Sequence, residues 1–271
     1  MSETIDAYQR FAEYYDLEYD QYQDDLDLYR QFAAEANGPV LELGCGSGRV
    51  LRALEGLGLP LAGIDPSPAM LALARQRLLP DTALAEVRME DLRPGMLPDS
   101  PYWLAFAAIN TFLHLPDAET QLAALAAIRS VVVDGGLLLL DLMAPDPHCL
   151  AGLDGRVILE FSGILPDGRR LDKWAARTHD LARQTIQTTV MFDTTDPVSG
   201  ALTRVTDRYA TRYIHRWELE HLLARAGWEL IALYGSYDLE PYRSESERMI
   251  ALATWNDGPL TPAGKDVPAD G

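Results

Sequence analysis

Apolar blocks of strand length alternate with amphipathic helical stretches over about residues 40–143. The apolar blocks predict five strands, at 40–43, 59–64, 83–89, 103–109 and 137–142. The stretches between them predict helices at 48–57, 67–79 and 117–132, with a turn at 134–136. Ser67 is placed to cap the second helix, and Pro68 takes its first helical position. Strand–helix alternation with short connections is typical of parallel strands joined by right-handed crossovers, so the pattern predicts an open, doubly wound α/β sheet.

The pattern changes after Pro147. Residues 156–214 are rich in Thr, Val, Ile and Arg, and their alternating segments predict three or four antiparallel strands. A helical pattern returns at 217–226, ends at Gly227, and is followed by predicted strands at 228–234 and 248–255. We therefore expect a seven-stranded, mostly parallel sheet that carries an antiparallel β insertion.

These changes divide the chain into four expected parts. They are an N-terminal helical arm or lid at 1–37, an α/β domain at 38–146 and 213–256, the β insertion at 147–212, and a flexible tail at 257–271. The insertion could cover a substrate, extend the sheet, or form the interface of a homodimer.

Composition excludes several classes of protein. Of 271 residues, 48% are hydrophobic, which is enough to bury a core and excludes disorder of the whole chain. The formal charge of −18 repels phosphate backbones, so we expect no nucleic-acid partner. No apolar run approaches the ~20 residues that span a bilayer, and the N-terminal segment lacks the features of a signal peptide. Only two cysteines are present, which favours a reducing, cytoplasmic setting.

A glycine-rich loop directly after the first predicted strand is the strongest chemical signal. Gly44, Gly46 and Gly48 occupy alternate positions, with Cys45 between the first two and Glu42 two residues before them. Glycines can adopt positive φ and let the backbone approach a ligand closely. A dinucleotide fold requires G-x-G-x-x-G, whose third glycine would fall where this chain has an arginine. The spacing therefore disfavours, without excluding, a nicotinamide-dependent oxidoreductase.

This segment resembles the first motif of class I S-adenosylmethionine (SAM) dependent methyltransferases, and the resemblance extends over about residues 40–143 and 213–255. It implies S-adenosyl-L-methionine as the cofactor, with the glycine backbone against its methionine part and ribose. It also implies that Glu42 orders the loop and approaches the amino end of the methionine moiety.

Two further stretches fall where that family binds its cofactor. Asp65 closes the second strand before Pro66, where a carboxylate can accept both ribose hydroxyls. Met70 could pack on adenine or fill the core. At the end of the third strand, the resemblance implies that Asp91 accepts from the adenine amine and that the Leu92 amide meets a ring nitrogen. Adjacent Glu90 takes the role of Asp91 if the match shifts by one position.

The end of the fourth strand carries Asn110 and His114, and in the family this end lines the methyl-transfer site. His114 could accept a proton from the acceptor near neutral pH, or serve only as a hydrogen-bonding loop residue. The chain has no N-P-P-Y motif here, which agrees with its charge in disfavouring DNA. No ligand spacing supports a metal site, and no G-x-S-x-G elbow supports a hydrolase.

The N-terminal arm is rich in tyrosine. Its segment 14–20, with Tyr15, resembles the arm of small-molecule methyltransferases such as sugar-amine N-methyltransferases and glycine N-methyltransferase. There the arm folds over SAM and a tyrosine faces the sulfonium, so the resemblance implies a cofactor-binding and catalytic role for Tyr15. Alternatively, Tyr8, Phe11 and Tyr15 form the packing face of an amphipathic helix.

Together these features predict a SAM-dependent methyltransferase that transfers a methyl group to nitrogen or oxygen of a small-molecule acceptor. The alternatives are the nicotinamide-dependent oxidoreductase and a catalytically silent SAM-binding scaffold protein. An activated methyl donor needs alignment more than acid–base help, so the chemistry does not require a dedicated base.

Overall fold

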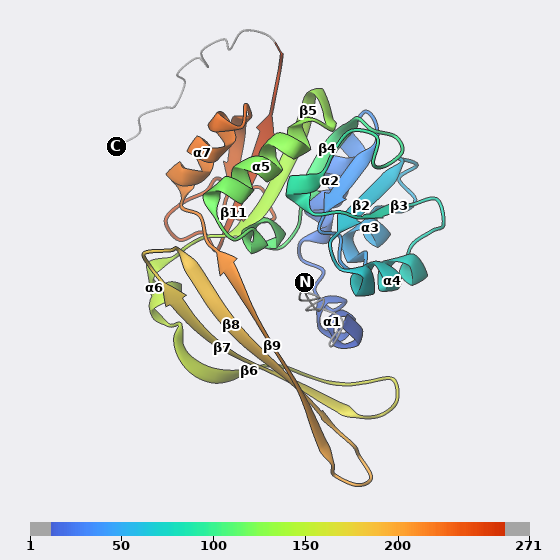
Figure 1. Cartoon of the computed structure of the whole chain (residues 1–271), viewed down its shortest axis with the longest axis vertical. Helices are drawn as coiled ribbons and strands as arrows, with labels where there is room; N and C mark the ends of the chain where they lie inside the picture. Colours follow the sequence, from blue (N-terminus) through green and yellow to red (C-terminus); the bar gives the residue numbers. More distant parts are fainter. Residues whose placement is uncertain (1–11, 258–271) are drawn as a thin grey trace, which may run out of the picture.

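The computed structural model describes residues 12–257, except for the side chains of Glu13 and Tyr15. A seven-stranded sheet forms its centre, in the order β10-β11-β5-β4-β1-β2-β3 (Figure 1). Strands β1 to β5 are parallel, whereas β11 is antiparallel to both of its neighbours. The strands are β1 (Val40–Leu43), β2 (Leu61–Asp65), β3 (Ala83–Glu86), β4 (Tyr102–Ala107), β5 (Val132–Met143), β10 (Glu229–Tyr234) and β11 (Arg248–Thr254). The doubly wound fold predicted from the alternating pattern is confirmed.

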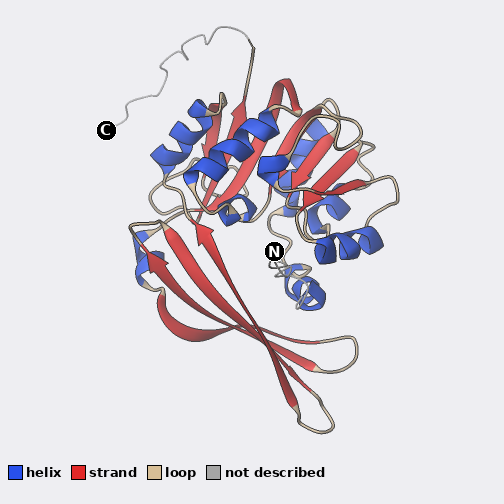
Figure 2. Cartoon of the chain, in the orientation of Figure 1, coloured by secondary structure: helices blue, strands red, loops and turns tan. Residues whose placement is uncertain are grey.

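Helices cover both faces of this sheet (Figure 2). The helical elements are α1 (Ala12–Tyr19), α2 (Leu26–Glu35), α3 (Arg49–Leu54), α4 (Pro68–Arg77), α5 (Ala118–Arg129), α6 (Pro147–Ala151) and α7 (Arg216–Arg225), with 3-10 turns η2 (Met89–Asp91) and η3 (Thr111–His114). Val40 belongs to the core formed with α2, α3 and α4, whereas Leu41 and Leu43 belong to the core formed with α5 and α7. All four residues of β1 are buried, and three of them are apolar, as expected of a strand covered on both faces; the exception is Glu42.

Side-chain caps begin α4 and α5, and the cap predicted at Ser67 is confirmed. The Ser67 hydroxyl accepts the amide of Met70 at 3.2 Å, and Pro68 begins α4. The Asp117 carboxylate accepts the amide of Thr120 at 2.8 Å at the start of α5. Each cap satisfies a backbone donor that the first helical turn leaves unpaired.

The turn predicted at 134–136 is wrong. These residues lie inside β5, which continues from Val132 through a register shift against β4. Gly135 has φ +75°, and its amide donates to the carbonyl of Trp255 at 2.8 Å. This hydrogen bond to the residue that follows β11 therefore makes Gly135 and Gly136 part of the strand. The predicted third and fourth strands are also too long, since β3 ends at Glu86 and β4 at Ala107.

The antiparallel insertion forms a separate four-stranded sheet in the order β6-β7-β8-β9. Its strands are β6 (Asp154–Ile164), β7 (Arg170–Asp180), β8 (Thr185–Thr195) and β9 (Leu202–Arg212). The sheet extends away from the seven-stranded sheet, and α1 lies beside it (Figure 1). Tyr14 of α1 is buried there, with its ring centroid 5.6 Å from that of Phe192.

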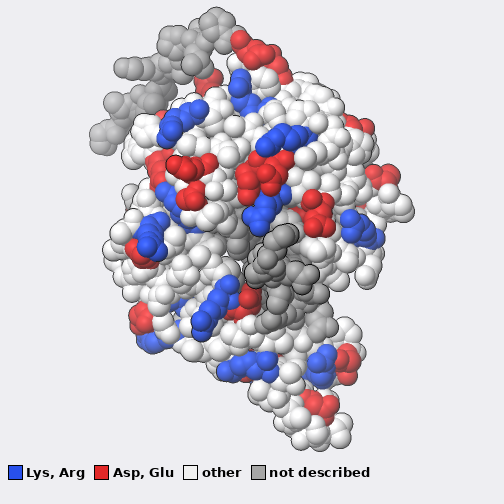
Figure 3. Space-filling view, viewed as in Figure 1, with Lys and Arg blue, Asp and Glu red and all other residues white. Residues whose placement is uncertain are grey.

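Acidic and basic side chains are interspersed over the face drawn in Figure 3. None of the helices within residues 12–257 combines the length and the apolar character that crossing a bilayer requires.

Candidate active site

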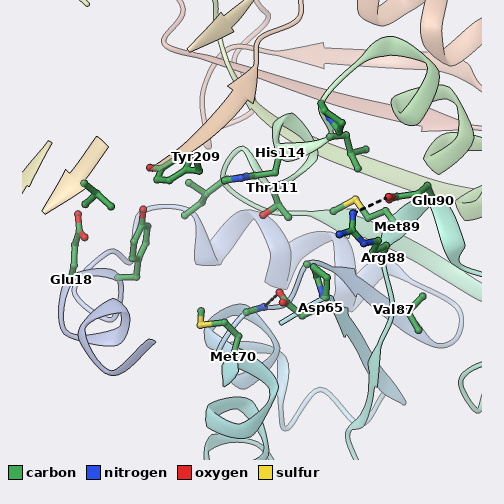
Figure 4. A pocket seen from close by; sticks show the side chains of 18 of the residues that line it. Glu18, Asp65, Met70, Val87, Arg88, Met89, Glu90, Thr111, His114 and Tyr209 are labelled. Carbon is green, nitrogen blue, oxygen red and sulfur yellow. Dashed lines mark hydrogen bonds and ion pairs between the residues drawn. The ribbon is translucent and has the colours of Figure 1, made fainter. Parts of the chain in front are cut away.

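A cavity of about 250 Å³ lies at the carboxyl ends of β1, β2, β3 and β4 (Figure 4). The "sheet wall" consists of the residues contributed by the loops after β1, β2 and β3: Gly44, Gly46, Asp65, Pro66, Met70, Val87, Arg88, Met89 and Glu90. The "insertion wall" consists of the residues contributed by α1 and the insertion: Glu18, Tyr19, Lys173, Val190, Phe192 and Tyr209. The segment after β4 joins the two walls through Ile109, Thr111, His114, Leu115 and Pro116.

The glycine loop folds as its spacing predicts. Gly44, Gly46 and Gly48 have φ values of +70°, +53° and +82°. A Cβ atom on Gly44 would collide with the methyl group of Thr111, and one on Gly46 would lie 3.3 Å from Cε of Met70. Gly44 and Gly46 line the cavity, whereas Gly48 lies outside its wall and precedes α3 as its N-cap. The backbone of the loop thus forms the floor of the cavity.

Two residues of this motif support the loop without lining the cavity. Glu42 is buried, and its carboxylate accepts the amide of Leu51 in α3 at 3.2 Å. Burial raises the pKa of Glu42 to about 8, against the opposing effect of Arg49. Cys45 is buried on the far side of the loop, where a Cβ atom on Gly63 would lie 2.8 Å from its sulfur. Both positions therefore fix the junction between β1 and α3.

Asp65 connects the glycine loop to the start of α4. One carboxylate oxygen accepts the amide of Gly46 at 2.9 Å, and the other accepts the amide of Ser67 at 2.8 Å. These bonds orient a carboxylate in the sheet wall, next to Pro66. Met70 is 2% exposed and also lines the wall, so its burial agrees with a core role, and its role toward adenine stays a prediction.

At the end of β3, the structure distinguishes the two acidic residues. Glu90 lines the cavity, and its carboxylate lies 3.5 Å from the guanidinium of Arg88. Figure 4 marks this ion pair with a dashed line. Asp91 is exposed outside the cavity wall, and Leu92 is buried in the core. The chain leaves β3 early and coils into η2, so strand alternation no longer decides which side chain faces the cavity. Of the two acidic residues considered for the adenine amine, Glu90 therefore lines the cavity and Asp91 does not, whereas the role of the Leu92 amide stays a prediction.

The segment after β4 presents His114 and Thr111 to the cavity. His114 stacks against Tyr209 of β9, with ring centroids 5.5 Å apart. Burial lowers the pKa of His114, so its imidazole is neutral at pH 7. Asn110 does not line the cavity, since its side-chain oxygen accepts the amide of Met143 at 2.5 Å.

Sequence reasoning missed most of the insertion wall. Lys173 of β7 is 8% exposed, and its ammonium donates to both carboxylate oxygens of Glu18 in α1 at 2.9 and 2.7 Å. Burial raises the pKa of adjacent Tyr19 to about 12, although Lys173 acts in the opposite direction. The sequence offers one hint, because Lys173 and Lys265 are the only lysines of the chain.

The arm is fastened to the sheet wall as well. Asp16 of α1 accepts the hydroxyl of Ser47 in the glycine loop, and Arg77 of α4 pairs with Asp16 and Asp20 at 2.9 Å each. Tyr15 belongs to α1, but its side chain lies outside the part that the structure describes. The role predicted for Tyr15 therefore stays a prediction.

Comparisons with known proteins identify the family. A methyltransferase domain profile matches residues 40–136, which contain most of the sheet wall. An uncharacterized methyltransferase of Staphylococcus carnosus is 30% identical over 152 residues, which cover 52% of this chain and 69% of that protein. The chain belongs to the SAM-dependent methyltransferases.

Other relatives agree with this membership. The cypemycin N-terminal methyltransferase of a Streptomyces species is 29% identical over 214 residues, which cover 79% of this chain and 81% of that protein. A SAM-dependent methyltransferase of Clostridium acetobutylicum has the same fold, with a TM-score of 0.75 at 16% identity over 92% of this chain and 99% of that one. The antiparallel insertion is part of this shared fold, since the match extends over nearly the whole chain.

The geometry of the methyltransferase fits its cofactor. A Cβ atom on Gly44 would collide with Thr111 and one on Gly46 would crowd Cε of Met70, so glycine at these positions suits a floor that a ligand approaches closely. An oriented carboxylate, Asp65, and an acidic side chain, Glu90, follow along the same wall. Ribose hydroxyls and an adenine amine are donors that such carboxylates can accept.

Proposed function

We propose that this enzyme binds SAM along the sheet wall and transfers the methyl group to a nitrogen or oxygen of a small molecule held against the insertion wall. The observation that supports this proposal most strongly is the difference between the two walls of the cavity. Backbone and carboxylates form one wall, and aromatic side chains with a Lys–Glu pair form the other. His114 lies between them.

The proposed cofactor contacts follow the sheet wall. Gly44 and Gly46 would hold the methionine part and ribose through their backbone, and Asp65 would accept the ribose hydroxyls. Met70 and Glu90 would meet the adenine. When bound, SAM supplies a methyl group already activated on a sulfonium. The remaining task of the chain is to align the acceptor and exclude water, and alignment alone can supply ~7–11 kcal/mol.

We assign His114 as the residue that accepts the acceptor's proton. Its lowered pKa keeps the imidazole neutral at pH 7, and stacking on Tyr209 fixes the ring toward the cavity. Such a base assists a hydroxyl acceptor and deprotonates an ammonium acceptor. The name of the Streptomyces relative, an N-terminal methyltransferase, supports nitrogen as the acceptor atom.

We further propose that the arm at 1–37 closes over the bound cofactor, with Tyr15 facing the sulfonium. The contacts of Asp16 with Ser47 and of Glu18 with Lys173 support this role, because they connect the arm to both walls. Deleting residues 1–20 should leave both sheets folded, retain part of the SAM affinity and remove methyl transfer. Retained transfer by the truncated chain would contradict the lid.

We also propose a homodimer formed through the β insertion. Within residues 12–257, β6 pairs only with β7, and its segment Val157, Ile158 and Leu159 is 44–57% exposed. An exposed apolar edge strand is a template for pairing with a second copy. Light scattering should give twice the chain mass, and Ile158→Lys should return the protein to the mass of a monomer.

We propose a cytoplasmic setting for the protein. Cys45 and Cys149 are free thiols, which supports this proposal.

Methyl transfer from labelled SAM to a panel of small amines and hydroxyl compounds tests the function. We expect transfer to at least one amine, and a loss of about 10²–10⁴-fold in His114→Gln. Binding of S-adenosylhomocysteine without transfer to any acceptor would support the scaffold alternative instead. Binding of NAD in place of S-adenosylhomocysteine would support the oxidoreductase.

A further inference from the structure

Behind the cavity, β5 carries a fully buried carboxylate, Asp141. One of its oxygens accepts the hydroxyls of Tyr29 at 2.9 Å and Tyr237 at 3.2 Å, and the other pairs with Arg248, whose Nε lies at 2.9 Å. Burial and then the charge of Asp141 raise the pKa of both tyrosines, so they remain protonated donors. Asp141 thus connects α2, β11 and the loop before β11.

The same residue holds the turn that ends β4. The amide of Ile109 donates to the Asp141 carboxylate at 3.1 Å, and the amide of Asn110 donates to the Asp141 carbonyl at 2.9 Å. Both turn residues have positive φ, +34° for Ile109 and +65° for Asn110. A β-branched residue rarely adopts positive φ, and such a conformation persists only where its surroundings impose it.

The position of this turn determines which side chains reach the cavity after β4. Ile109 lines the cavity itself, and the chain then enters η3, which presents Thr111 and His114. The methyl group of Thr111 occupies the space that a Cβ atom on Gly44 would need. A relaxed turn would therefore displace Thr111, which faces the glycine floor, and His114, which is proposed to face the acceptor.

We propose that Asp141 is a positioning residue of this enzyme, which holds the Ile109–Asn110 turn in its strained conformation and thereby sets the cofactor site. The inference rests on the proposed function in one respect, that the cavity binds SAM. Asp141 acts through the turn and does not line the cavity.

A merely structural role for Asp141 is the competing explanation, and the insertion offers a matched control. Asp193 is 4% exposed, and its two carboxylate oxygens pair with Nε and Nη2 of Arg204 at 2.6 Å each. Asp193→Asn therefore removes the charge of another buried aspartate that pairs with an arginine, here the exposed Arg204, and it does so outside the cavity wall.

The experiment is calorimetric titration with S-adenosylhomocysteine. We expect Asp141→Asn to weaken binding about tenfold. Only molecules whose Ile109–Asn110 turn has the conformation of the wild type can bind, and the variant lowers their fraction. Asp193→Asn should leave the affinity within about twofold. Adding Ile109→Gly to Asp141→Asn should restore most of the affinity, because glycine adopts positive φ without a Cβ penalty. Adding Ile109→Ala should not restore it, although alanine also removes most of the side chain.

Wild-type affinity in Asp141→Asn, or equal affinities of the two double variants, would overturn the inference. If Asp141→Asn does not fold, the single variants still test it. Relief of strain predicts that Ile109→Gly melts at a higher temperature than Ile109→Ala, and the reverse order contradicts it. Failure of the wild-type chain to bind S-adenosylhomocysteine would instead contradict the proposed function.

Discussion

On the sheet wall of the cavity, Gly46 presents backbone and Asp65 presents a carboxylate that is itself bonded to backbone. On the insertion wall, Lys173, Phe192 and Tyr209 present side chains from three neighbouring strands of the second sheet. The sheet wall comes from short loops that directly follow parallel strands, where open α/β folds bind ligands. The comparison indicates that the fold itself builds the cofactor site, whereas the acceptor site depends on which side chains the insertion presents.

The largest expected effect is that of Gly46→Val. A branched side chain resists φ +53° and would crowd Cε of Met70, so S-adenosylhomocysteine affinity should fall by more than about 100-fold. Gly168→Val is the matched control, because Gly168 has φ +88° but open space around it. Calorimetry on both folded variants should show a loss only at Gly46, and equal losses would remove the glycine loop from the cofactor site.

A smaller loss is expected from Asp65→Ala. Removing the carboxylate takes away the proposed acceptor of the ribose hydroxyls and the bond to the Gly46 amide. We expect binding of S-adenosylhomocysteine to weaken by about 1–3 kcal/mol. An unchanged affinity in the same titration would contradict the assignment of Asp65 to the ribose hydroxyls.

Glu42→Gln tests whether Glu42 supports the loop from behind. The folded pKa of about 8 exceeds the ordinary value of 4.5, so the stability that Glu42 contributes is complete below 4.5 and is lost as pH rises through 8. Relative to the wild type, the variant should therefore gain roughly 2–5 kcal/mol of unfolding free energy between pH 5 and pH 9. Chemical denaturation at both pH values measures this gain. Exposed Glu245→Gln is the control, and an identical pH dependence of wild type and Glu42→Gln would show that Glu42 is ionised in the fold.

The smallest effect on cofactor affinity is expected from Lys173→Met. This change breaks the pair with Glu18 on the insertion wall and leaves the sheet wall intact. Because the sheet wall stays intact, affinity for S-adenosylhomocysteine should change by less than about threefold, which corresponds to less than about 1 kcal/mol. Hydrogen exchange of α1 should become faster. A loss as large as that of Asp65→Ala would place Lys173 in the cofactor site.

The sheet wall could be predicted because its determinants are local in sequence. Gly46 and Asp65 each follow a strand whose apolar run is visible, and strands of a parallel sheet end at the same edge. The sequence left the choice between Glu90 and Asp91 open because local alternation stops there: beyond Glu86 the chain coils, and the side chain that lines the cavity is that of Glu90.

The insertion wall could not be predicted in the same way. Lys173 and Glu18 are 155 residues apart, and their pairing depends on how the second sheet docks on α1. The alternation in β8 shows which residues share a face, but no local signal shows what that face meets. The role of Asp141 was equally hidden, because its partners come from four separate segments of the chain.

Amide hydrogen exchange with and without S-adenosylhomocysteine tests most directly whether the cofactor binds the sheet wall and leaves the insertion wall to the acceptor. We expect the sheet wall to gain the most protection, at residues 44–48, 65–70 and 87–90. We expect little change in β7, β8 and β9, where the acceptor would bind. Protection gained on these three strands with none on the glycine loop would contradict the assignment of the two walls.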